Sequence, residues 1–388
     1  MEWLVESWSL WVLLASAFVI GWGAETAQTF MSRALALSIL AWLQTAPEFA
    51  VEATIAWNQQ QDLMIANLTG SLRLLVGLGW PMIFIVHMVS TWMREKRFVK
   101  RIQLGNDDSL AVIFLFISIG YFFLVFGKRS LTVYDAGALV AIYMTYLVLA
   151  ARMPAHDADE PEEIEDLPWI GKQIVKLPRS GQIASTTAIF VLGGIALYFS
   201  AHPFIGTLEK WSVTLGISTF VFVQWVAPFL SEFPEKVSAF NWARQRGKAP
   251  MAVMNMVSSN INQWTMLAAM VPLVYSLSRG EFSAVELDHM HWMELALTVA
   301  QSALAGLFLL DLRFTLAECL AIFLLWIAQF VYAPLREEIA IIYVIWFVLA
   351  VVHYFGRYFR QGYVPKSIAY LRRKHGSPPV KARRGGRK

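Results

Sequence analysis

The chain has 388 residues, of which 57% are hydrophobic and 15% are charged, and its formal net charge is +4. Soluble domains typically contain about 25% charged residues, so this composition excludes an ordinary water-soluble globule. Sixteen Trp and 26 Phe add the aromatic surface that is typical of membrane interfaces. The single cysteine, Cys319, permits no intrachain disulfide and no cysteine-based metal site. We therefore predict an all-α, multi-pass membrane protein.

Hydropathy supports this class along the whole chain, because apolar stretches long enough to cross a bilayer as a helix recur. Windows of about 19 residues predict eleven spans, which are Leu10–Thr29, Ala34–Trp57, Leu63–Thr91, Leu110–Phe126, Leu131–Ala151, Ile183–Ala201, Val213–Trp242, Met251–Leu277, Trp292–Leu310, Phe314–Tyr332 and Ile339–Phe359. We expect the first span to be retained rather than cleaved as a signal peptide, because Glu2 and Glu6 replace the positive region that precedes such peptides.

The connections between the spans carry an uneven share of Lys and Arg. Most of these residues fall in alternate connections and in the C-terminal tail, and cytoplasmic loops are enriched in such residues. This pattern predicts that the N-terminus is outside and the C-terminus inside. The basic tail after Pro365 is expected to bind lipid headgroups at the membrane surface. No nucleic-acid-binding module is recognisable, so we expect no nucleic-acid partner.

A segment at residues 152–180 separates two groups of spans. It begins with an acidic run from Asp157 to Asp166, which is typical of a solvated linker, although a regulatory cation sensor is an alternative. Apolar residues then recur at helical spacing, which predicts a short helix lying on the cytoplasmic membrane surface; they are Leu167, Ile170, Ile174 and Leu177.

Ionisable side chains within spans are costly to bury, so each one indicates a function. They concentrate in two similar stretches, Leu43-Gln44-Thr45-Ala46-Pro47-Glu48 and Leu230-Ser231-Glu232-Phe233-Pro234-Glu235. A proline inside a helix deprives the carbonyl four residues earlier of its hydrogen-bond donor, here that of Leu43 or Leu230. Such carbonyl oxygens, hydroxyl groups and a carboxylate are the hard ligands that Ca²⁺ prefers. Each stretch therefore predicts part of an ion site at membrane depth.

A second pair of similar stretches follows, Asn67-Leu68-Thr69-Gly70-Ser71 and Asn255-Met256-Val257-Ser258-Ser259-Asn260. One Pro-Glu hairpin (34–91) would turn outside and the other (213–277) inside, which is typical of inverted repeats with a site at the midplane. We predict two inverted five-helix repeats at 1–151 and 181–332. An extra transmembrane helix and the basic cytoplasmic tail would follow at 333–388.

At these motifs the sequence resembles the sodium/calcium exchanger superfamily of cation antiporters. The resemblance implies that Glu48 and Glu235 are the central ligands of the transported cations. It also implies flanking ligands at Thr45, Ser71, Ser231 and Ser259, with the carbonyls of Leu43 and Leu230 nearby. We further expect ion-binding side chains at Gln44, Asn67, Glu232, Asn255 and Gln263. The sequence departs from the family pattern at several positions, among them Leu43, Gln44, Leu72, Leu75 and Leu230.

Three further charged residues in the spans would tune the charge of the site. Arg73 either forms a buried pair with Glu52 or places its guanidinium in a cation subsite as a fixed charge. Lys236 lies four residues after Glu232 and therefore on the same helix face. A local ion pair between them is the simpler interpretation; otherwise Glu232 is an extra ligand or proton carrier. Burial favours the neutral form of a carboxyl group unless a cation offsets it, so neighbouring carboxyl groups can exchange protons for metal.

We predict a cation antiporter that works by alternating access and moves a divalent cation, Ca²⁺, against Na⁺ or H⁺. The alternative is a non-transporting scaffold or sensor in which Arg73 replaces a bound cation. The partners would be the lipid bilayer and the metal cations, with no resident cofactor and no enzymatic activity. Short connections suggest a prokaryotic plasma-membrane protein, and the oligomeric state does not follow from the sequence.

Overall fold

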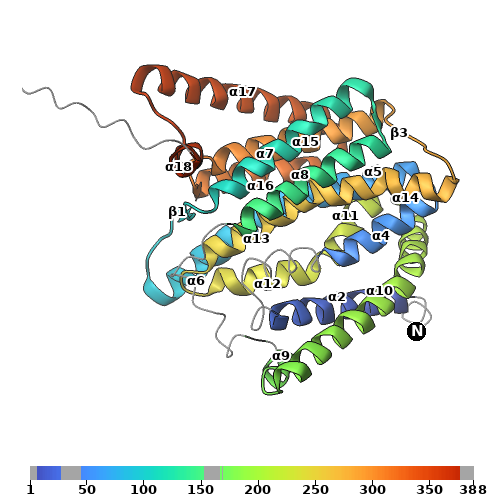
Figure 1. Ribbon diagram of the computed structural model, residues 1–388. Coiled ribbons are helices and arrows are strands. Elements are labelled where there is room, and N and C mark those ends of the chain that lie inside the picture. Colours follow the sequence, from blue (N-terminus) through green and yellow to red (C-terminus); the bar gives the residue numbers. More distant parts are fainter. Residues whose placement is uncertain (1–6, 28–44, 153–166, 168, 376–388) are drawn as a thin grey trace, which may run out of the picture.

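The computed structural model describes residues 7–27, 45–152, 167 and 169–375, and these residues are mostly helical (Figure 1). The elements of the first half are α2 (Trp8–Ala27), α4 (Ala46–Trp57), α5 (Gln61–Leu74), the π-helical η1 (Leu75–Gly79), α6 (Trp80–Glu95), β1 (Arg101–Gln103), α7 (Ser109–Lys128), β2 (Ser130–Leu131) and α8 (Val133–Ala151). Those that follow are α9 (Trp169–Ile174), α10 (Arg179–Leu215), α11 (Thr219–Ser231), α12 (Phe233–Arg244), α13 (Ala249–Asn262), the π-helical η3 (Gln263–Leu267), α14 (Ala268–Arg279), β3 (Val285–Glu286), α15 (His289–Leu309), β4 (Arg313–Thr315), α16 (Leu316–Val331), η4 (Ala333–Leu335), α17 (Arg336–Gln361) and α18 (Lys366–His375).

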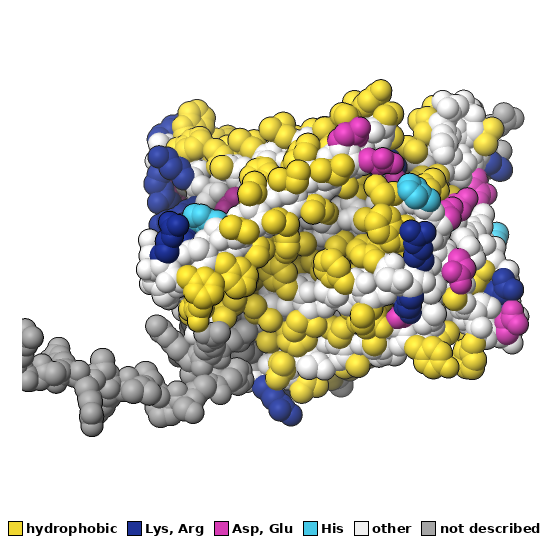
Figure 2. Space-filling view, turned by 90° about the horizontal axis from the view of Figure 1, so that it is seen from above, with side chains coloured by type: hydrophobic (Ala, Val, Ile, Leu, Met, Phe, Trp, Pro, Cys, Tyr) yellow, Lys and Arg dark blue, Asp and Glu magenta, His cyan; other side chains and the backbone are white. Residues whose placement is uncertain are grey.

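The surface of the described helices is that of a membrane protein. Among the described residues, six helical stretches are long and apolar enough to cross a bilayer. Figure 2 shows a face that is largely hydrophobic between two ends where charged side chains gather. Large apolar side chains stand exposed along α17, among them Leu349 and Phe359. An exposed apolar face of this kind fits a lipid solvent, and the predicted all-α, multi-pass membrane class is confirmed.

Helix boundaries differ from the predicted spans in two places. The helix predicted to end at Ala201 continues as α10 to Leu215, where Gly216 adopts φ +67° and ends it. Glu209 and Lys210 suggested a loop, but Glu209 accepts a hydrogen bond from Gln60 within the helical bundle. The span predicted at 213–242 is two helices, because α11 ends at Ser231 and α12 starts at Phe233. Span 34–57 is described only from residue 45.

The predicted surface helix is present as the short α9. Leu167 and Ile174 are buried, whereas Leu177 is exposed. The helix contacts α2 and α10, so its buried apolar side chains pack against other helices; its position on the membrane surface stays a prediction. The acidic run before it and the end of the basic tail lie outside the described residues.

The two halves repeat each other in detail. Helices α4 and α12 each have 12 residues with a proline near the start, and α5 and α13 each have 14. Both α5 and α13 lead directly into a five-residue π-helical turn, η1 and η3. Such turns are rare in helices and frequent at functional sites, so their recurrence places equivalent irregular backbone in both halves.

Two small antiparallel sheets join the halves. Strand β1, between α6 and α7, pairs with β4, between α15 and α16; β2, between α7 and α8, pairs with β3, between α14 and α15. By the order of the helices, β1 in the first half corresponds to β3 in the second, and β2 corresponds to β4. Each strand therefore pairs with the counterpart of the other strand in its own half, and not with its own counterpart. Repeats of opposite orientation require this exchange, because the same connection lies at opposite ends of the two halves. The pairing supports the inverted arrangement, which stays a prediction.

Helix α5 passes close to α11 at Gly70. A Cβ atom added there would lie 1.8 Å from the carbonyl oxygen of Gln224. We expect Gly70→Ala to force the two backbones apart and to lower the free energy of unfolding by about 1–3 kcal/mol, measured by thermal unfolding in detergent. Gly120→Ala in α7 is the control, because a Cβ there meets nothing within 4 Å. A Gly70→Ala protein as stable as the control would contradict the close approach.

Candidate cation site

Each Pro-Glu motif begins a new helix. Thr45 precedes α4 and Glu232 precedes α12, and a proline follows in the first turn of each helix, where its missing N–H is not needed. The glutamates Glu48 and Glu235 lie in the same first turns, where the helix dipole favours negative charge. The break predicted in the second motif is therefore a helix junction. It brings a carboxylate, a hydroxyl group and irregular backbone together.

The Leu230 carbonyl is one of the predicted ligands. The backbone N–H of Glu232 at this junction donates to the Pro228 carbonyl at 3.0 Å. The Leu230 carbonyl stays a predicted ligand at the helix junction. Leu43 and Gln44, the matching candidates of the first hairpin, lie outside the described residues.

Gln263, the first residue of η3, links the two hairpins. Its side-chain nitrogen donates to Glu48 Oε2 and to Glu232 Oε1, each at 2.8 Å. One nitrogen atom thus reaches carboxylates from α4 and from the α11–α12 junction, so these two carboxylates lie close together. Glu48 is fully buried, and the Ser71 hydroxyl of α5 also lies within reach of its carboxylate.

Glu235 is held by helix α13. Its Oε1 atom accepts hydrogen bonds from the Ser259 hydroxyl and, at 3.3 Å, from the Asn255 side-chain nitrogen. Glu232 in turn forms an ion pair with Lys236, four residues later. The predicted local pair is confirmed, and it balances the charge of Glu232. Glu48 and Glu235 are left as the two carboxylates of this cluster without a cationic partner among the described residues.

Residues beyond the predicted set also reach this cluster. Asn262 donates to the Thr45 hydroxyl at 2.7 Å and so makes a second link between the hairpins. Asn260 is buried in the same helix, α13. The sequence did contain a signal for both, because Asn260 and Asn262 are amides at the end of a helix that lies within a predicted span.

The cluster contains buried acceptor oxygens that have no hydrogen-bond partner among the described residues. Buried polar atoms are normally paired, so a group of unpaired oxygens indicates a ligand that carries positive charge. These atoms are Glu48 Oε1, Asn67 Oδ1, Glu235 Oε2, Asn262 Oδ1 and Gln263 Oε1. Within the described ranges no three His, Cys, Asp or Glu side chains are grouped to hold a metal. A cation here would be bound by carboxylate and neutral oxygens together, as Ca²⁺ commonly is.

Two of the predicted hydroxyl ligands bond to their own helices. Ser71 donates to the Leu68 carbonyl at 3.1 Å, and Ser231 donates to the Pro228 carbonyl at 3.4 Å. Both are buried. Because their protons are used in this way, their oxygen lone pairs remain available to a cation.

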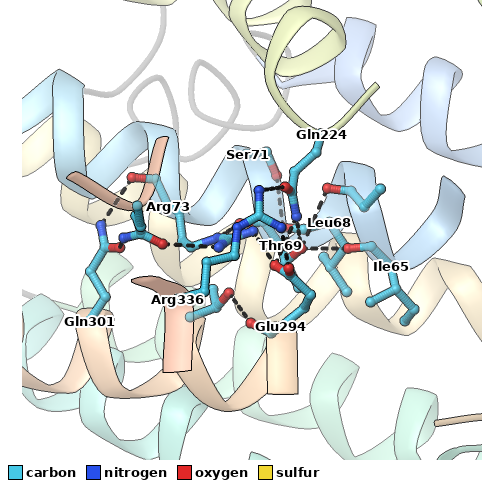
Figure 3. A network of polar contacts seen from close by, with 12 residues as sticks. Ile65, Leu68, Thr69, Ser71, Arg73, Gln224, Glu294, Gln301 and Arg336 are labelled. Atoms are coloured by element: carbon cyan, nitrogen blue, oxygen red, sulfur yellow. Dashed lines mark hydrogen bonds and ion pairs between the residues drawn. The ribbon is translucent and has the colours of Figure 1, made fainter. Parts of the chain in front are cut away.

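Arg73 does not lie in the carboxylate cluster, and its predicted pairing with Glu52 is wrong. Its Nη2 atom is 2.5 Å from Glu294 Oε2 of α15, and its Nη1 atom donates to Gln329 of α16 at 3.0 Å (Figure 3). Residues two positions apart on a helix do not share a face, so Arg73 points away from the side of α5 that carries Ser71. Glu52 instead accepts a hydrogen bond from Asn67.

The contacts of Arg73 belong to a second buried network, which sequence reasoning missed. Arg336, in the first turn of α17, pairs with Glu294 and donates to Gln224 at 2.9 Å. Figure 3 shows Arg73 and Arg336 reaching the same carboxylate. Gln301 donates to the Arg73 carbonyl at 3.0 Å. The network attaches α17 to α5, α11 and α15, so the eleventh predicted span is an integral part of the fold.

Comparisons with known proteins agree with this architecture. A sequence model of the family described as "Sodium/calcium exchanger protein" matches residues 3–152 and again residues 185–334. Comparison with curated protein sequences finds no match.

Three solved structures resemble the chain over most of its length. The H⁺/Ca²⁺ exchanger CAX is 27% identical with a TM-score of 0.84, over 95% of this chain and 90% of that one. Native YfkE is 13% identical with a TM-score of 0.61, over 84% and 91%. The sodium-calcium exchanger NCX_Mj, soaked with 2.5 mM Na⁺ and 10 mM Sr²⁺, is 18% identical with a TM-score of 0.54, over 84% and 96%. The last two likenesses concern the fold alone.

Proposed function

Because this chain belongs to the sodium/calcium exchanger protein family, we propose that it moves Ca²⁺ across the membrane against H⁺ or Na⁺, at Glu48 and Glu235. Membrane transport by antiport follows from the family. The similarity to an H⁺/Ca²⁺ exchanger at 27% identity favours H⁺ as the counter-ion. Alternating access fits a site placed between two repeated halves.

The observation that carries the proposal is the set of buried oxygens on both hairpins that have no partner among the residues the structure describes. Glu48 and Glu235 each keep one such oxygen, and Asn262 and Gln263 add neutral ones. An ionised carboxylate buried without a counter-charge is strongly unfavourable. These two carboxylates therefore need either a cation or protons, and exchanging one for the other is the chemistry of an antiporter.

The charges of the cluster suggest how many ions exchange. Lys236 neutralises Glu232, and Glu52, which is buried without a cation, is counted as protonated. The fixed charge to be balanced is then that of Glu48 and Glu235. One divalent cation or two monovalent cations balance it. We therefore propose an electroneutral exchange in which two H⁺ or two Na⁺ move against each Ca²⁺.

The non-transporting alternative has less support. It required Arg73 to replace a bound cation, whereas its guanidinium bonds to Glu294, Gln329 and the Thr69 carbonyl. We retain the proposals that the chain is not an enzyme and that it lies in a prokaryotic plasma membrane with its N-terminus outside, on the sequence arguments given above.

Flux through proteoliposomes tests the proposal. The purified chain should take up radioactive Ca²⁺ when an outward gradient of H⁺ or of Na⁺ is imposed. In a Glu48→Gln/Glu235→Gln double variant we expect uptake at the level of protein-free vesicles, because the charges that bind Ca²⁺ are gone. Glu286→Gln is the matched control, since Glu286 is exposed in β3.

Two results would contradict the proposal. Uptake that persists in the double variant would remove the role of these carboxylates. A wild-type chain that shows no flux with either gradient would favour the non-transporting alternative.

A further inference from the structure

The first hairpin buries a second carboxylate, Glu52, to which the proposed exchange gives no task. It lies on α4 one turn after Glu48 and is 0% exposed. Among the described residues it makes one hydrogen bond, in which the Asn67 side-chain nitrogen donates to Glu52 Oε2 at 2.6 Å, and it makes no ion pair. Burying a carboxylate for a single hydrogen bond is unfavourable, so its presence calls for a role.

The second hairpin shows what the equivalent asparagine does without this carboxylate. Asn67 and Asn255 occupy the same position, four residues before Ser71 and Ser259. By the alignment of α4 with α12, Ala239 stands where Glu52 would be. There the Asn255 nitrogen donates to Glu235, the site carboxylate itself. We therefore attribute to Glu52 the fact that the Asn67 nitrogen donates to it and not to Glu48.

The orientation of the Asn67 amide follows from this bond. The Glu52 Oε2 atom accepts this bond, so it fixes the nitrogen end of the amide and turns the oxygen end away. The Asn67 oxygen is buried and has no hydrogen-bond partner within the described part of the chain. Asn67 lies one turn from Ser71 on α5, and its partner Glu52 lies one turn from Glu48 on α4.

We propose that Glu52 is a positioning residue, which holds Asn67 with its oxygen, rather than its nitrogen, available to the transported cation. This inference rests on the proposed function of the site. Groups behind a metal ligand commonly fix its orientation in this way. An added neutral oxygen favours Ca²⁺, which takes six to eight oxygen ligands, over the smaller Mg²⁺. The first repeat would then present the oxygen of Asn67 to the site, whereas the second repeat presents the nitrogen of Asn255.

Two substitutions of Glu52 separate positioning from charge. Glu52→Ala copies the second repeat and frees the Asn67 amide; we expect the Ca²⁺ concentration for half-maximal uptake to rise about tenfold or more, with a smaller change in maximal rate. Glu52→Gln keeps an oxygen that accepts from Asn67, so we expect half-maximal uptake within about twofold of wild type. Asn67→Ala should raise the Ca²⁺ concentration for half-maximal uptake as much as Glu52→Ala does, and the double variant should raise it no further.

The Glu52→Gln result decides between the roles. A tenfold loss in Glu52→Gln would overturn the proposal, because Glu52 would then act through its charge. The proposal would also be overturned if uptake were unchanged in Glu52→Ala. It would fail as well if the effects of Glu52→Ala and Asn67→Ala on half-maximal uptake added up in the double variant. Competition by Mg²⁺ should increase in Glu52→Ala but not in Glu52→Gln. The proposed function fails separately, through absent wild-type flux or through flux that survives loss of Glu48 and Glu235.

Discussion

Replacing Glu294 with Leu should cost about 3–5 kcal/mol of unfolding free energy, because it removes one side of a buried ionic network. Glu294 is the carboxylate that pairs with both Arg73 and Arg336. Arg73 is fully buried, so the variant leaves a guanidinium inside the protein without a counter-charge. The measurement is the thermal unfolding midpoint of the detergent-solubilised protein, together with its yield as a monodisperse species.

A matched control and a compensating variant make this test specific. Glu286→Leu removes an exposed glutamate and should be close to neutral. Combining Glu294→Leu with Arg73→Leu should recover part of the loss, because the Arg336 side chain keeps 15% exposure and can extend its charge toward water. A Glu294→Leu protein that unfolds at the temperature of Glu286→Leu would show that the network contributes nothing to stability.

The sequence predicted the features that depend on neighbours along the chain. The length of each apolar stretch predicts a span, and the four-residue spacing of Glu232 and Lys236 predicts their ion pair. Partners of Arg73 could not be predicted in this way, because Glu294 is 221 residues away and Gln329 is 256 residues away, on two other helices. Helical geometry did offer a partial signal, since Arg73 and Ser71 cannot share a face of α5.

The candidate site shows the same division. Glu48 and Glu235 stand out because each follows a proline within an apolar span. The bridging role of Gln263 required the packing of α4 against the second hairpin, since its nitrogen donates to residues 215 and 31 positions earlier. The sequence likewise could not show that the Asn67 side chain neighbours Glu52 rather than Arg73, because this depends on how α4 and α5 face each other.

Lys236→Gln should convert an electroneutral exchanger into one that responds to membrane potential. In the wild type Lys236 balances Glu232, so one Ca²⁺ or two monovalent ions satisfy the remaining charge. Without the lysine three carboxylates need balance, and three monovalent ions would move against each Ca²⁺. One net positive charge then leaves for each Ca²⁺ that enters, so an inside-positive potential should accelerate Ca²⁺ uptake. A potential of 100 mV is worth about 2.3 kcal/mol for each charge moved.

Potentials clamped with K⁺ and valinomycin across proteoliposomes measure this change. Wild-type uptake and that of Lys210→Gln, an exposed position on α10, should not depend on the potential. Because removing one member of a buried pair destabilises a protein by roughly 3–5 kcal/mol, a Glu232→Gln/Lys236→Gln variant is needed too. It restores the charge balance and should again be insensitive to potential. Wild-type uptake that changes steeply with potential would refute the charge count, because Glu48 and Glu235 could then not be the whole of the unbalanced charge.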